Sequence, residues 1–195
     1  SVKDGTVSLE YAPLQVRIFT SDPEAPRLET VESVLSRIQN FVRKEAESGN
    51  LCHISHTPGV IYSPLYKDTF EVQAYRNWLT DGLFTRTYRA VPNSKTDPEP
   101  WLGIEFKRPE TVSRFEVGWK LQGDTLSDQD MIFRIEVFQG GKWTSVPEKS
   151  RKIQREGTVI KVQVETTPAQ TEKFRIVFGK QDKVLISPCE LRAFK

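Results

Sequence analysis

The chain has 195 residues, of which 37% are hydrophobic and 28% are charged, and its formal net charge is +2. This composition is that of a polar globular protein, and the length allows one large β domain or one domain with an extension. The nearly balanced charge argues against a dedicated nucleic-acid binder, which shows a clustered basic surface, and no apolar run reaches the roughly 20 residues that span a bilayer.

Residues 1–50 are predicted to form an N-terminal extension of short strands, a linker and one helix. Alternating apolar residues over 7–11 and 14–19 indicate the strands, and a proline-rich turn follows them. The helix is predicted over 28–48, where apolar residues recur at the spacing of a single helical face. This apolar stripe consists of Val31, Val34, Leu35, Ile38, Phe41 and Val42.

The apolar stripe of the helix needs a partner surface, and two kinds of partner remain open. The helix packs on the neighbouring domain, or it contacts another chain or domain as a docking or spacer element. The stripe covers about three turns, which is too short to indicate a coiled coil by itself.

From residue 51 onward, short strands dominate the pattern. The stretch 101–119 alternates apolar and polar residues on both sides of Pro109, and we interpret it as two strands joined by a turn at 107–110. A pair of glycines within 132–146 indicates a hairpin. Further strands are predicted at 60–62, 159–165, 173–178 and 191–194. Many short strands separated by turns indicate a mostly β fold, an antiparallel sandwich or barrel.

A series of short motifs follows in order through residues 51–195. They are Leu-Thr-Asp-Gly at 79–82, Pro-Trp-Leu-Gly-Ile-Glu-Phe at 100–106, Val-Ser-Arg-Phe-Glu-Val at 112–117, Phe-Arg-Ile-Glu-Val at 133–137, Trp-Thr-Ser-Val at 143–146, Lys-Phe-Arg-Ile-Val-Phe at 173–178 and Cys-Glu-Leu-Arg-Ala-Phe at 189–194. This succession resembles the discoidin domain, also termed the coagulation factor five/eight C-type domain. Its relatives include bacterial carbohydrate-binding modules and fucose-binding lectins. The resemblance implies an antiparallel jelly-roll β-sandwich of the galactose-binding-like kind over residues 51–195.

The two cysteines of the chain, Cys52 and Cys189, bracket the discoidin-like segment. Because the first and last strands of such a sandwich lie close together, the resemblance implies that the two cysteines form a disulfide. The alternative is two free thiols, with Cys189 acting as a small buried hydrophobe. A disulfide would indicate an oxidising compartment, so the expected location is extracellular or at the cell surface.

A calcium site is also implied by the resemblance. In the carbohydrate-binding branch, an Asp-Gly loop and a glutamate of the last strand often hold a structural calcium, and the matching residues here are Asp81, Thr85 and Glu190. Backbone carbonyls would complete the six to eight oxygen ligands that calcium prefers. Leu83 departs from the small or polar residue usual after Asp-Gly. The alternative is that the Asp-Gly pair only forms a tight turn.

Two long loops are predicted, at 77–100 and 121–130. Residues whose side chains suit sugar binding are concentrated around the first of them. Sugars need a flat aromatic face for their C–H surface and amide or guanidinium groups for their hydroxyls. The candidate ligand-binding residues are Tyr75, Asn77, Trp78, Arg86, Tyr88 and Arg89. The same set also suits an anionic membrane surface or a protein partner. A further alternative places Trp78 and one tyrosine in the core.

Two further observations bear on the predicted function: the places of the remaining tryptophans and the absence of enzyme motifs. Trp101 and Trp143 lie within strand motifs and are predicted to be core residues, whereas Trp119 is ambiguous. No nucleophile elbow, phosphate loop or dinucleotide fingerprint is present, and the histidine and spaced arginine pair of the fucose-binding lectins is not evident. We therefore predict a non-catalytic module of a larger protein that binds carbohydrate through loops at one end. The alternative is an adhesion module that contacts a protein or phospholipid surface.

Overall fold

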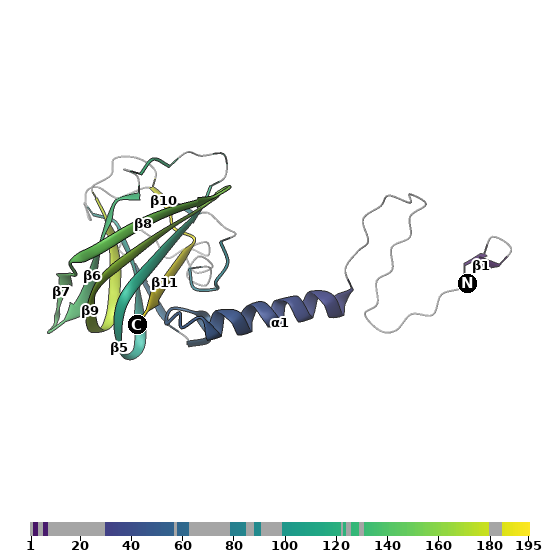
Figure 1. Ribbon diagram of the computed structural model, residues 1–195, viewed down its shortest axis with the longest axis horizontal. Coiled ribbons are helices and arrows are strands. Elements are labelled where there is room, and N and C mark those ends of the chain that lie inside the picture. Colours follow the sequence, from purple (N-terminus) through teal and green to yellow (C-terminus); the bar gives the residue numbers. More distant parts are fainter. Residues whose placement is uncertain are drawn as a thin grey trace. The chain divides into compact units, whose positions relative to one another are not determined.

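The structure is a computed structural model of the chain (Figure 1). It describes residues 2–3, 6–7, 30–56, 58–62, 79–84, 88–90, 99–121, 123, 126–128, 131–179 and 185–195, and of these only the backbone at 2–3, 6–7, 62, 88–90 and 185–187. The chain divides into two compact units, Ser1–Ile38 and Gln39–Lys195.

The first unit contains a two-stranded ladder and the first part of the helix. Strand β1 (Val2–Lys3) pairs antiparallel with β2 (Thr6–Val7), while most of the strand pattern predicted over 7–19 lies outside the described residues. The helix predicted over 28–48 is present as α1 (Val31–Glu47). It is capped by Thr30, whose Oγ1 accepts the Ser33 amide at 3.1 Å.

The apolar stripe of α1 is largely exposed to solvent. Val31 is 61% exposed, Leu35 and Ile38 are each 51% exposed, and Val42 is 46% exposed. None of the side chains of α1, all of which are described, is buried. Within the described part of the chain, no helix is long and apolar enough to cross a membrane.

The second unit is a mostly β antiparallel sandwich, which confirms the fold class predicted from the sequence. After a short 3-10 turn, η1 (Ile54–His56), its strands are β3 (Gly59–Tyr62), β4 (Tyr88–Ala90), β5 (Trp101–Lys120), β6 (Phe133–Gln139), β7 (Lys142–Ser145), β8 (Glu148–Glu156), β9 (Val159–Phe178), β10 (Leu185–Ser187) and β11 (Glu190–Phe194). The main sheet runs in the order β11-β5-β9-β6-β7, with β3 beside β5 and β8 beside β9. Strand β4 pairs separately with β10.

Strands β5 and β9, each 20 residues long, pass through both layers of the sandwich (Figure 1). The first part of β5, 101–105, pairs with β3 and with 173–177 of β9. Its second part, 110–120, pairs with β11 and with 159–171 of β9. The register shifts between the two parts, so both strands change layer at the same place.

The two strands predicted within 101–119 are therefore not a hairpin, and this interpretation is wrong. The turn predicted at 107–110 is a bend inside the continuous strand β5, and both halves pair with β9 rather than with each other. Pro109 lies in the interrupted part of the ladder, where its missing amide hydrogen breaks no strand pairing. The strands predicted at 159–165 and 173–178 are likewise two parts of β9.

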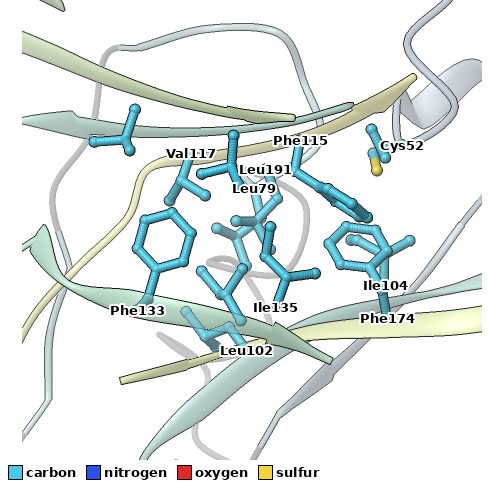
Figure 2. Packing of buried hydrophobic residues seen from close by; sticks show 14 of the residues in the cluster. Cys52, Leu79, Leu102, Ile104, Phe115, Val117, Phe133, Ile135, Phe174 and Leu191 are labelled. Atoms are coloured by element: carbon cyan, nitrogen blue, oxygen red, sulfur yellow. The ribbon is translucent and has the colours of Figure 1, made fainter. Parts of the chain in front are cut away.

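The hydrophobic core fills the space between the layers (Figure 2). Phe174 of β9 packs edge-on against Phe115, with ring centroids 4.9 Å apart, and lies 5.9 Å from Phe106. Trp119, which the sequence left ambiguous, is buried in this core. Other members are Leu102, Ile104, Val117, Phe133, Ile135 and Leu191. Each such side chain contributes about 1.5–3 kcal/mol by its burial, and together they fix the frame that carries the loops.

Candidate functional site

The predicted sugar-binding residues lie in and before β4. Tyr88 and Arg89 belong to β4, whose backbone pairs with β10 in the register Tyr88↔Ser187 and Arg89↔Ile186. The other four, Tyr75, Asn77, Trp78 and Arg86, lie outside the described residues. Because β10 precedes β11 in the chain, this pairing attaches β4 to the segment that leads into the last strand of the sandwich.

Two of the predicted calcium residues meet at one turn. Asp81 accepts the Leu83 amide through Oδ1 at 2.8 Å, and Gly82 has a φ of 79°, a conformation that favours glycine. Glu190, the first residue of β11, accepts the Gly82 amide through Oε2 at 3.1 Å. The Asp-Gly loop and the glutamate of the last strand are thus adjacent. The third predicted ligand, Thr85, lies outside the described residues.

Glu190 is a completely buried acid, with an exposed fraction of 0%. Burial raises the pKa of its carboxyl well above the usual value, Arg192 opposes this rise, and nearby Asp81 adds to it. The ionised form of Glu190 is therefore poorly compensated, and an additional positive charge would stabilise it.

Arg192 contacts three carboxylates at once. Its Nη2 lies 3.1 Å from Glu45, its Nη1 lies 3.6 Å from Glu116, and its Nε lies 3.4 Å from Glu190. Nη2 also donates to the Gly82 carbonyl at 3.1 Å. The buried Glu45 Oε2 is out of line for a hydrogen bond, so charge alone holds it to the guanidinium. Arg192 thereby ties the last turn of α1 to β5 and β11.

The residues around this turn offer part of a calcium site. Asp81 and Glu190 provide the hard oxygen atoms that calcium prefers, and three acids around one arginine leave negative charge to be compensated. Among the described residues, however, no group of three or more His, Cys, Asp or Glu side chains is arranged to hold a metal ion. Asp81 and Glu190 are the side chains that would hold calcium, with backbone carbonyls completing its shell.

Trp101 and Trp143 are not core residues, and this prediction is wrong. Both are half-buried and lie outside the core cluster. The next residue after Trp101 is Leu102, which faces the core, so strand alternation turns Trp101 to the outer face. Trp143 pairs with Phe138, which faces outward for the same reason, because Val137 is in the core.

An arginine joins the two indoles on this outer face. The Cζ atom of Arg175 lies 5.1 Å from the Trp101 ring centroid and 4.4 Å from that of Trp143. Arg175 donates through Nε to one oxygen of Glu136 at 2.7 Å, and Arg134 donates to the other at 2.8 Å. Burial alone would raise the pKa of Glu136, but these two hydrogen bonds hold it below its usual value. We refer to Trp101, Phe138 and Trp143 as the outer-face aromatic row.

Solved structures with this architecture share little sequence with the chain. CpGH89CBM32-5 from Clostridium perfringens, solved in complex with GalNAc-β-1,3-galactose, matches with a TM-score of 0.51 at 9% identity, over 75% of this chain and 99% of that chain. The F5/8 type C domain of a Bacteroides fragilis protein matches with a TM-score of 0.50 at 20% identity, over 70% of this chain and 89% of that one. The sandwich has the discoidin-like fold. No family model and no curated protein sequence matches the chain.

In this discoidin-like domain the two cysteines are free, which corrects the predicted disulfide. The Leu51 amide donates to the Ala193 carbonyl, so Cys52 lies beside the end of β11, whereas Cys189 precedes its start. Residues 189 and 193 are four residues apart along the strand, which corresponds to about 13 Å. This is well beyond the roughly 7 Å that a disulfide allows between Cα atoms. Burial raises the pKa of both thiols, that of Cys189 to about 12, so both are unreactive at neutral pH.

Sequence reasoning missed the arginines that organise both polar clusters of the discoidin-like domain. For Arg175 and the outer-face aromatic row, a signal was present, because alternation around Leu102 already turns Trp101 outward. For Arg192, the carboxylate partners Glu45 and Glu116 come from elements far away in the sequence. No local pattern indicates that cluster.

Proposed function

We propose that the chain is a non-catalytic carbohydrate-binding module of a larger extracellular or cell-surface protein. The observation that carries this proposal is the discoidin-like fold, which it shares with a Clostridium perfringens module solved with GalNAc-β-1,3-galactose. Pairing of β4 with β10 supports it further, because part of the predicted binding segment is then held by the segment that leads into β11. Binding residues gather on loops that a rigid scaffold positions.

In this proposal the loops at one end of the sandwich hold the sugar through two kinds of contact. The side chains proposed to stack on the apolar faces of the sugar are Tyr75, Trp78 and Tyr88. The groups proposed to donate or accept hydrogen bonds with its hydroxyls are Asn77, Arg86 and Arg89. Aromatic rings supply apolar contact and guanidinium or amide groups supply direction, which is the usual division of labour in a ligand site.

A glycan array with the whole chain tests the proposal. We expect saturable binding to a limited set of glycans, lost in Trp78→Ala and in Arg86→Ala. The control is Lys149→Ala, because Lys149 is an exposed residue of β8 and is not among the proposed contacts. Absence of binding by the folded chain across a broad array would contradict the proposal, and so would equal binding by Trp78→Ala and the control.

A protein or phospholipid surface is the second candidate ligand, and the exposed stripe of α1 favours it. In that case the helix docks on another chain or domain, or on an anionic membrane. Sedimentation with vesicles containing phosphatidylserine, and sedimentation velocity of the chain alone, separate these possibilities from sugar binding. Leu35→Lys should abolish either association while leaving glycan binding unchanged. A chain that stays monomeric and unbound in both assays would exclude self-association and membrane binding.

We also propose that Asp81 and Glu190 hold a structural calcium, supported by the buried and poorly compensated carboxylate of Glu190. Calcium would supply the missing positive charge at this turn without taking part in any reaction. The melting temperature should then rise when calcium replaces a chelator, and the rise should vanish in Asp81→Asn. An identical melting temperature with calcium and with chelator would overturn this part of the proposal.

A further inference from the structure

The outer-face aromatic row is an unusual feature for the exposed face of a sheet. Trp101 of β5, Trp143 of β7 and Phe138 of β6 are all partly exposed. Their ring centroids are 6.2 Å apart for the two indoles and 5.3 Å apart for Trp143 and Phe138. Outer faces of antiparallel sheets are normally polar, and single exposed hydrophobic residues need no explanation, but three contiguous rings do.

Charged neighbours hold the rings of this row in place. Arg175 lies over both indoles and is itself fixed by Glu136. Lys173 places its Nζ 4.5 Å from the Phe138 centroid. Cation–π contacts of this kind contribute about 0.5–1 kcal/mol each at exposed sites. A ligand that stacks on rings already held in this way loses little conformational entropy on binding.

The charges around the row cancel. The cations are Arg134, Lys173 and Arg175, and the carboxylates paired with them are Glu99, Glu105 and Glu136. Arg134 binds Glu99 through two parallel hydrogen bonds of 2.8 and 2.7 Å. Three cations against three carboxylates leave no net charge, so this face does not attract an anionic polymer or an acidic lipid.

The row ends at a polar groove. Trp101 is the first residue of β5, directly after the loop 77–100 that carries predicted sugar contacts. At the other end of the row, Phe138 borders a groove of about 510 Å³. The groove is lined by Pro109, Phe138, Gln139, Gly140, Gly141, Gln170, Thr171 and Glu172. The Thr171 hydroxyl is buried and bonded to the backbone, but the exposed Gln139, Gln170 and Glu172 offer amide and carboxylate groups to sugar hydroxyls.

We infer that the outer-face aromatic row is a second carbohydrate-binding surface, and that the ligand is an extended neutral oligosaccharide rather than a single terminal sugar. The sugar held by the loops would continue over Trp101 and Trp143 towards Phe138 and the groove. Rings contact the C–H faces of successive sugars, and the groove binds hydroxyls of the distal unit. This inference rests on the proposed function and adds the length and charge class of its ligand.

Calorimetric titration with galactose, a neutral galacto-oligosaccharide of six units and a heparin hexasaccharide tests the inference. For the wild-type chain the neutral hexasaccharide should bind about tenfold more tightly than galactose, a difference of about 1.4 kcal/mol. Trp143→Ala should reduce that preference to threefold or less while leaving the affinity for galactose unchanged. Trp143→Phe should restore most of it, because a ring is retained. Ile132→Ala is the control, since Ile132 is exposed and is not part of the row.

Each result decides the matter. Equal affinity for galactose and the hexasaccharide, or an undiminished preference in a folded Trp143→Ala variant, would overturn the second surface while leaving the proposed function intact. Tighter binding of heparin than of the neutral hexasaccharide would overturn the inference that the ligand is neutral. Absence of binding to glycans of any length or charge would overturn the proposed function together with this inference. If Trp143→Ala does not fold, greater protection of tryptophan from acrylamide quenching by the hexasaccharide than by galactose supports the surface, and equal protection by the two sugars refutes it.

Discussion

Arg192 compensates three acids that come from separate elements of the domain. Replacing it with methionine keeps the length of the side chain but leaves Glu45, Glu116 and Glu190 without their cation. Removing one partner of a buried ion pair costs roughly 3–5 kcal/mol, so Arg192→Met should lower stability by about that amount. Chemical denaturation measures the change.

A matched control is available for this variant. Arg108 pairs with Glu110 at 3.0 Å, but its side chain is 82% exposed. Arg108→Ala should change stability by less than about 0.5 kcal/mol, as surface ion pairs contribute little. Equal stability of Arg192→Met and Arg108→Ala would show that the Arg192 cluster does not hold the domain together.

Glu190 should make stability depend on pH in the direction opposite to that of an ordinary salt-bridged acid. Its folded pKa is raised, so the folded chain binds more protons than the unfolded chain above the ordinary value of 4.5. Stability should therefore fall as pH rises from about 4.5 towards neutral in the absence of calcium. Glu190→Gln should flatten this part of the profile, which thermal melts at successive pH values in a chelator will show. A wild-type stability that does not fall over this interval, or that has the same slope as that of Glu190→Gln, would contradict the assignment.

At the scale of elements, β5 and β9 decide the architecture because each belongs to both layers. Phe174 of β9 contacts both Phe106, which follows the first part of β5, and Phe115 in the second part. Phe174→Ala would remove the contact that joins the two parts. We expect a loss of about 3–5 kcal/mol, as for other buried Phe→Ala changes. Ile132→Ala, at an exposed site, should cost less than about 0.5 kcal/mol in the same denaturation experiment.

Sequence patterns predicted most of these elements and failed where two long strands bend together. The helix was predictable because the apolar spacing of its residues is a local signal. The bend in β5 looked like a turn because Pro109 and charged neighbours mark turns and strand corners alike. Strand β8 was missed because its sequence, Glu-Lys-Ser-Arg-Lys-Ile-Gln-Arg-Glu, is almost entirely polar, and only its pairing with β9 makes it a strand.

The candidate site was less predictable than the fold. The adjacency of Asp81 and Glu190 followed from the family resemblance, and the structure describes both around Gly82. The outward orientation of Trp101 follows from strand alternation, but its contact with Trp143 depends on strand order, which a sequence does not contain. The predicted disulfide was wrong because two cysteines at the two ends of a domain sequence need not lie beside each other in the fold.

At the scale of the whole molecule, the chain combines a discoidin-like sandwich with a helix whose apolar stripe is exposed. Because the cysteines are free, the proposed extracellular location rests on the binding function and not on redox chemistry. The net charge of +2 gives no strong long-range attraction for either sign of ligand. Binding should therefore come from shape and stacking, and should change little with salt.

In the proposed function, loops at one end of the sandwich bind sugar. An amide ¹H–¹⁵N correlation spectrum of the whole chain, titrated with GalNAc-β-1,3-galactose and with glycans positive on the array, measures this directly. For the disaccharide we predict saturable shifts in the segment 75–90, including the Trp78 indole signal. For longer neutral glycans we predict additional shifts of the Trp101 and Trp143 indole signals. A spectrum unchanged by every glycan, or shifts confined to the residues of α1, would contradict the account.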